Sequence, residues 1–128
     1  MSVQISGTTV IDDNKGLQNL AGIENLAQTF SSVTGTVTLN LSLYNVFYIA
    51  PAGAITISIS NAPSSNKSRV IVLHIYNGGS YSITWPGDWK WAGGTTPTLG
   101  TGTSVDIIVA TMVDATNWRA MRSQSHSS

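Results

Sequence analysis

Two histidines, His74 and His126, are the first candidates for chemistry, because a neutral imidazole can act as a general base or a metal ligand. His74 lies in the apolar segment Val70 to Tyr76, and His126 lies in the serine-rich tail. Neither has a metal-binding partner at ligand spacing, and the chain contains no cysteine. We therefore interpret His74 as a buried or interface histidine with a hydrogen-bonded ring. The alternative is an ion held by three copies of His74 on a threefold axis.

The carboxylates are dispersed along the chain in the same way. Asp12 and Asp13 fall in a polar segment typical of a turn, whereas Asp106 falls within an apolar segment. A carboxylate in apolar surroundings needs a partner, and we expect Arg119 or Arg122 to supply it. No serine lies in a nucleophile elbow, and no glycine pattern matches a phosphate-binding loop. The sequence therefore predicts no catalytic residue, no bound cofactor, no metal site and no enzyme activity.

Tryptophans make one segment unusual, since Trp85, Trp89 and Trp91 fall close together. Exposed indoles beside polar side chains can stack on sugar rings, so one interpretation is a glycan-binding loop. The other interpretation is architectural: the indoles fill the end of a domain or a seam between subunits, because large aromatic side chains are costly to leave in water. The architectural interpretation is favoured, and the glycan interpretation stays open.

Charge is scarce in this chain. Only 9% of the residues are charged, six basic and six acidic, against about 25% in a typical soluble domain. No basic patch is available to neutralise a row of phosphates, which disfavours nucleic-acid binding. No apolar run reaches the roughly 18 residues of a membrane span, and no signal peptide is recognisable, so we expect no membrane partner. The absence of cysteine fits folding in a reducing cytoplasm. Low net charge favours association, which we interpret as a sign of assembly.

The elements that position these residues are expected to be β-strands. Apolar and polar residues alternate with a period of two from Val37 to Leu43 and from Ile55 to Ile59. Arg69 to Asn77 and Val105 to Val113 are apolar on both faces, as expected of central strands or subunit contacts. Further strands are predicted at Val46 to Ile49, at Tyr81 to Trp85 after an Asn77-Gly78-Gly79 hairpin turn, and at Trp118 to Arg122. The pattern predicts an antiparallel β-sandwich or jelly-roll-like domain over residues 33–122 and a flexible tail over 123–128.

The N-terminal segment, residues 1–32, has a different pattern. Val3-Gln4-Ile5 and Thr9-Val10-Ile11 are predicted to be short extended pieces. After them an apolar residue recurs every three positions, a spacing that drifts around the surface of an α-helix. We expect an extended or short-helical strap that cannot bury these side chains alone. The candidate interface residues for a partner chain are therefore Leu17, Leu20, Ile23, Leu26 and Phe30.

A series of short motifs begins at Trp85, the first of the clustered tryptophans. Its members are Trp85-Pro86, Lys90-Trp91, Gly93-Gly94, Pro97 and Leu99, followed by a Val105-Asp106 strand, a hairpin at Asp114 to Asn117 and Trp118. This order resembles a group of phage tail-fibre and virion-associated domains, over roughly residues 33–122. The resemblance implies a jelly-roll-like β domain, a homotrimer and a place in the virion.

On that resemblance we predict a trimeric bacteriophage capsid decoration, or cement, protein. Residues 1–32 would anchor it to the major capsid protein or another virion protein, or would swap between protomers, and the β domain would form an outward knob. We expect no long shaft before this domain, in contrast to fibre knobs. One alternative is a tail-fibre or tail-tip knob that binds a host surface glycan through Trp85, Trp89 and Trp91. A further alternative is a cellular lectin-like adhesin, against which the missing signal peptide counts.

Overall fold

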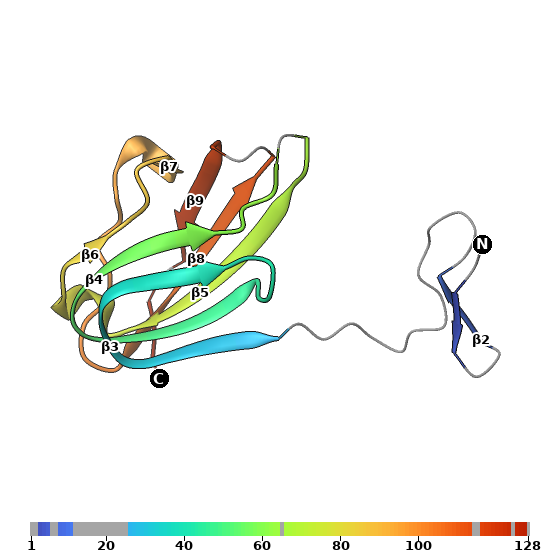
Figure 1. Cartoon of the computed structure of the whole chain (residues 1–128). Helices are drawn as coiled ribbons and strands as arrows, with labels where there is room; N and C mark the ends of the chain where they lie inside the picture. The colour runs from blue at the N-terminus through green and yellow to red at the C-terminus, as the bar shows by residue number, and fades with distance from the viewer. Residues whose placement is uncertain are drawn as a thin grey trace.

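A computed structural model of the 128-residue chain describes residues 3–5, 8–11, 26–64, 66–113, 116–123 and 125–127. This part of the chain is all-β, as predicted, with two short 3-10 turns, η1 (Gly78–Ser80) and η2 (Ala92–Gly94). The strands, labelled where there is room in Figure 1, are β1 (Val3–Ile5), β2 (Thr8–Ile11), β3 (Ala27–Asn40), β4 (Val46–Ser60), β5 (Arg69–Tyr76), β6 (Ile83–Thr84), β7 (Trp89–Trp91), β8 (Ser104–Met112), β9 (Trp118–Arg122) and β10 (His126–Ser127).

The strands form two sheets. β1 and β2 make a two-stranded antiparallel sheet, which confirms the short extended pieces predicted near the N-terminus. The other eight strands make one sheet in the order β3-β4-β5-β8-β9-β7, with β6 paired to β4 and β10 paired to β8. This sheet passes the expected domain limits at residues 33 and 122, because β3 begins at Ala27 and β10 lies in the tail. Residues 27–30 are thus extended, and the short-helical alternative is wrong for them.

The two longest strands, β3 and β4, each bend in the middle and return (Figure 1). Their first arms, residues 27–30 and 46–49, pair in parallel, and after a shift in register so do their second arms, residues 35–40 and 55–60. In β3 the bend includes Gly35, whose φ of 74° is a left-handed conformation that glycine adopts without steric cost. The two predicted strands at Val46–Ile49 and Ile55–Ile59 are therefore one bent strand.

The bent strands β3 and β4 lie side by side as two layers, and a third layer beside β4 is made of two separate strands. β5 pairs in parallel with the first arm of β4, and β6 pairs in parallel with its second arm. The three layers therefore follow one another like turns of a coil, and β8 and β9 then add antiparallel beyond β5.

The prediction of an antiparallel sheet is wrong for the pairs β3–β4, β4–β5, β4–β6 and β7–β9, which are parallel. Alternating apolar residues do not distinguish the two kinds of pairing. A parallel neighbour ordinarily requires a long crossover connection. Here the second arm of the bent strand carries the chain back, so residues 41–45 suffice to reach the start of β4.

The hairpin predicted at Asn77-Gly78-Gly79 is also absent, because β6 pairs with β4 and not with β5. Asn77 has a left-handed φ of 54°, and its side-chain oxygen accepts a 2.7 Å hydrogen bond from the Gly102 N–H. Gly79 donates its N–H to the Gly100 carbonyl oxygen at 2.8 Å. A Cβ at Gly79 would lie 2.2 Å from the Leu99 carbonyl oxygen, so only glycine allows this close approach. The η1 turn and the segment 99–102 are thereby fastened together.

The apolar core of the described residues is formed where side chains from the second arms of β3 and β4 pack with side chains from the first arm of β4 and from β5 and β8. On β5 and β8 every second residue is fully buried, while the alternate residues are half-buried or exposed. β5 is central, between β4 and β8, as its apolar character on both faces predicted. The buried core residues include Val37, Leu39, Phe47, Ile49, Ile55, Ile57, Ile71, Leu73, Ile75, Ile108, Ala110, Met112, Trp89, Trp118 and Ala120.

Candidate functional site

The tryptophans form one packed cluster at the end of the domain. Trp85 follows β6, Trp89 and Trp91 lie in β7, and Trp118 begins β9. The Trp85 ring stacks on Trp89 with centroids 5.7 Å apart, and it meets the edge of Trp91 at 4.9 Å. Trp89 in turn lies 6.0 Å from Trp118, its register partner in the parallel β7–β9 pair. The structure therefore brings the three predicted aromatic residues together and adds Trp118.

Burial divides this cluster into two pairs. Trp89 is 5% exposed and Trp118 is 1% exposed, so neither offers a ring face to a ligand. The buried Trp89 Nε1–H has no hydrogen-bond partner among the described residues. Trp85 and Trp91 are half-buried and pack against the core. The arrangement agrees with the architectural interpretation for Trp89, whereas Trp85 and Trp91 still border open space.

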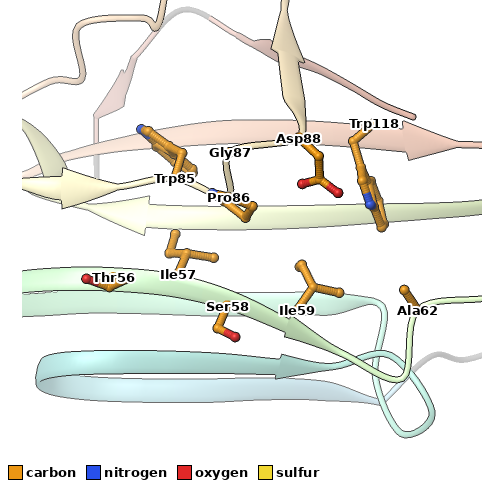
Figure 2. A pocket seen from close by; sticks show the side chains of 10 residues that line it. All are labelled: Thr56, Ile57, Ser58, Ile59, Ala62, Trp85, Pro86, Gly87, Asp88 and Trp118. Carbon is orange, nitrogen blue, oxygen red and sulfur yellow. The ribbon is translucent and has the colours of Figure 1, made fainter. Parts of the chain in front are cut away.

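A groove of about 460 Å³ lies beside Trp85, between the second arm of β4 and the segment that follows β6. Figure 2 shows Ile57 and Ile59 pointing into it from β4, with the Asp88 carboxylate facing them from the other side. The groove is lined by Thr56, Ile57, Ser58, Ile59, Ala62, Trp85, Pro86, Gly87, Asp88 and Trp118. Sequence reasoning missed it, because neither the bend in β4 nor the early end of β6 was predicted.

A smaller hollow of about 200 Å³ lies beside Trp91, on the side of η2. Its lining residues are Trp91, Ala92, Thr95, Pro97, Met121 and Arg122. It combines a half-buried indole with threonine and a guanidinium group, which are groups that can contact a polar ligand. It is therefore a second place at which the tryptophan segment is accessible.

Asp106 is fully buried on β8 and has the arginine partner that the sequence required. Of the two predicted candidates, Arg122 is the partner: its Nε donates to Asp106 Oδ1 at 2.7 Å. Ser125 Oγ donates to the same oxygen at 2.8 Å, and the Gly100 N–H donates to Oδ2 at 2.7 Å. Arg119, by contrast, donates to the Trp118 carbonyl oxygen at 3.2 Å. The Asp106 carboxylate is therefore fully used in holding β8, β9 and the tail together.

The histidines lie in separate surroundings. His74 is half-buried on β5, opposite Tyr48 of β4 and Ile107 of β8. His126 is exposed in β10, with its Nε2 3.3 Å from Ser123 Oγ. Within the described residues, no three histidine, cysteine or carboxylate side chains come together in a way that could hold a metal ion. Asp12 and Asp13 lie outside these residues.

Only part of the predicted N-terminal interface can be placed. Leu17, Leu20 and Ile23 lie outside the described residues. Leu26, immediately before β3, is 72% exposed, and Phe30 on β3 is half-buried against the core. Phe30 therefore already has a place within its own chain, whereas Leu26 remains available to another one.

Comparison of the chain with protein-family models, with curated proteins and with solved structures gives no match. None of the helical segments among the described residues is both long and apolar enough to span a membrane.

Proposed function

We propose that this chain is a non-enzymatic structural protein of a bacteriophage particle, which assembles as a homotrimer and decorates the capsid. The observation that carries the proposal is the free edge of β3. In the described part of the chain, β3 pairs with β4 on one side and with no strand on the other. Its 14 residues contain no charge and no proline.

Such an edge is unusual for a protein that stays alone. A long unpaired edge exposes a row of N–H and C=O groups that can pair with another chain, and proteins commonly block it with lysine, proline or a bulge that twists it away. β3 is bent and irregular near Val33, but neither lysine nor proline protects it. Exposed leucines stand close to both ends of the strand, Leu26 at 72% and Leu43 at 62%. These features support β3 as a site of assembly.

The trimer and the virion are supported by the resemblance of the segment Trp85 to Leu99 to phage tail-fibre and virion-associated domains. A decoration protein that binds only the assembled shell stabilises that shell by mass action. The uncharged β3 edge and exposed Leu26 would supply the surface that such binding requires. Residues 1–25 would contribute the anchor, and the β domain would face outward.

The proposal is tested by placing charge on the β3 edge of the full-length chain. Thr36 and Thr38 are exposed on β3, and we expect Thr36→Lys/Thr38→Lys to reduce the trimer to monomer and to abolish co-sedimentation with assembled capsids. The matched control is Thr56→Lys, because exposed Thr56 is the register partner of Thr36 on β4. We expect this control to retain the trimer mass, measured by light scattering. An edge variant that is folded, trimeric and capsid-bound would contradict the proposal.

A second candidate function is a tail-tip knob that binds host glycan, and the hollow beside half-buried Trp91 favours it. Its volume of about 200 Å³ would suit a single sugar ring. The two functions differ in the response to Trp91→Ala. A decoration protein keeps its capsid binding in this variant, whereas a glycan-binding knob loses adsorption to host cells while remaining trimeric.

A further inference from the structure

The second arm of β4 loses its neighbouring strand part-way along. β6 pairs with it over Ile83 and Thr84 only. A parallel ladder continues when every second residue of the added strand donates its N–H, and the next such residue is Pro86, which has no N–H. Proline therefore ends β6, and residues 57–60 of β4 have no strand on this side within the described part of the chain.

The Ile55–Ser82 hydrogen bond shows which backbone groups of β4 face the side where β6 lies. Ile55 donates its N–H to the Ser82 carbonyl oxygen at 3.0 Å, on the side where β6 lies. Peptide groups alternate in direction along a strand, so Ile57 and Ile59 face the same side as Ile55. The carbonyl of Ile57 and both backbone groups of Ile59 therefore point into the space beyond the end of β6.

The groove of about 460 Å³ follows this same edge. The consecutive residues 56–59 all line it, although their side chains alternate in direction, so the strand backbone itself is part of its wall. Ile57 and Ile59 point into it, and Pro86 and Asp88 lie across from them (Figure 2). A segment entering the groove would meet backbone groups along one edge and apolar side chains beneath it.

Among the described residues that line the groove, Asp88 alone is charged. Its half-buried side chain projects toward the groove, and it makes no hydrogen bond or ion pair with the described residues. A carboxylate in this position favours a basic group on the occupant and disfavours an acidic one.

We propose that this groove binds a short extended peptide segment of a partner protein by β-strand addition, continuing the sheet where β6 ends. The bound segment carries a lysine or arginine beside Asp88 and an apolar residue over half-buried Ile59, since the side chain of Ile57 is buried in the core. A strand matches the spacing of the free N–H and C=O groups along residues 57–60, and strand addition combines such backbone bonds with pockets for alternate side chains. This surface is distinct from the β3 edge, so the inference does not depend on the proposed function.

The probe for this site is a capped pentapeptide of alternating isoleucine and threonine with one central lysine. It is titrated into the full-length protein, and the backbone amide resonances are followed by NMR. We expect concentration-dependent shifts at Ile57 and Ile59 and at the Trp85 indole. A peptide N-methylated on the residues that face β4 cannot donate these hydrogen bonds, so its affinity falls at least about tenfold. Methylation on the opposite edge is the matched control and leaves the affinity within about twofold.

The charge preference is tested with a second peptide in which glutamate replaces lysine. We expect it to bind about fivefold more weakly than the lysine peptide, as for a partly exposed ion pair. In Asp88→Asn this difference falls to within about twofold. The inference is overturned if methylation of either edge has the same effect, or if no peptide shifts these amides and a glycan does. Failure of the β3 variants to change trimer mass or capsid binding would overturn the proposed function and leave this result unaffected.

Discussion

Removal of the Asp106 carboxylate provides the sharpest test of the structural role assigned to the most buried charge. Asp106 is 0% exposed and accepts hydrogen bonds from Gly100, Arg122 and Ser125. The variant Asp106→Ala removes all of these bonds at once. It leaves the Arg122 guanidinium, which lies 2.6 Å from the carboxylate, without its counter-charge.

The expected loss in the free energy of unfolding can be estimated from the burial of the two charged groups. Breaking a fully buried ion pair by removing one partner costs about 3–5 kcal/mol, because the remaining charge stays buried without compensation. The Arg122 side chain is 24% exposed, so water partly resolvates it, and we expect a loss of about 3 kcal/mol in the free energy of unfolding. With a urea dependence of about 2 kcal/mol per molar, the unfolding midpoint falls by about 1.5 M.

The assay is urea denaturation followed by tryptophan fluorescence, at one fixed protein concentration because assembly itself stabilises the fold. Asp88→Ala is the matched control, since this half-buried carboxylate has no partner among the described residues, and we expect a change within about 0.5 kcal/mol. The double variant Asp106→Ala/Arg122→Ala should lose less than the sum of the single variants. Equal midpoints for Asp106→Ala and Asp88→Ala would refute a structural role for Asp106.

Two further predictions concern the loop and the tryptophan cluster. Gly79→Ala places a Cβ 2.2 Å from a backbone oxygen and should lower the free energy of unfolding by about 2–4 kcal/mol, whereas Gly87→Ala, with nothing within 4 Å, should change it by less than about 1 kcal/mol. Trp89→Ala removes a buried indole and should cost about 3–5 kcal/mol, clearly more than Trp91→Ala at its half-buried position. Thermal and urea unfolding measure both, and equal losses within either pair would contradict the packing described.

Local pattern was sufficient to predict most of the strands. The segments assigned to β5, β8 and β9 were identified by apolar residues and flanking turn residues, and their buried positions follow the period of two. The pairing of the strands was not predictable in the same way. The alternation of apolar and polar residues requires only that one face of the strand is buried. It does not depend on whether the neighbouring strand runs parallel or antiparallel. The bends near Gly35 and Pro51 decide the topology, but a glycine and a proline within apparent strands predict turns equally well.

The candidate site shows the same division between local and long-range information. The need of Asp106 for an arginine was predictable from polarity, but the choice of Arg122 over Arg119 depends on the position of Ser125 and Gly100 around it. The tryptophan segment was identified by composition. Its packing against Trp118 depends on the parallel β7–β9 pair, whose two strands are far apart in the sequence.

The large sheet has two edges of different character, the edge of β3 and the edge of the second arm of β4. At one end β3 carries no charge and, among the described residues, pairs with a strand on one side only, so a partner added there as proposed would be selected by shape and backbone pairing alone. At the other end β8 and β9 extend the sheet beyond β5, and no strand of the described part of the chain continues beside residues 57–60 of β4, near the carboxylate of Asp88. A segment added at that edge, as proposed, would be selected by sign of charge as well as by shape. Two edges with different selectivity would favour two different partners, which supports the proposal that the protein joins copies of itself to another component of a particle.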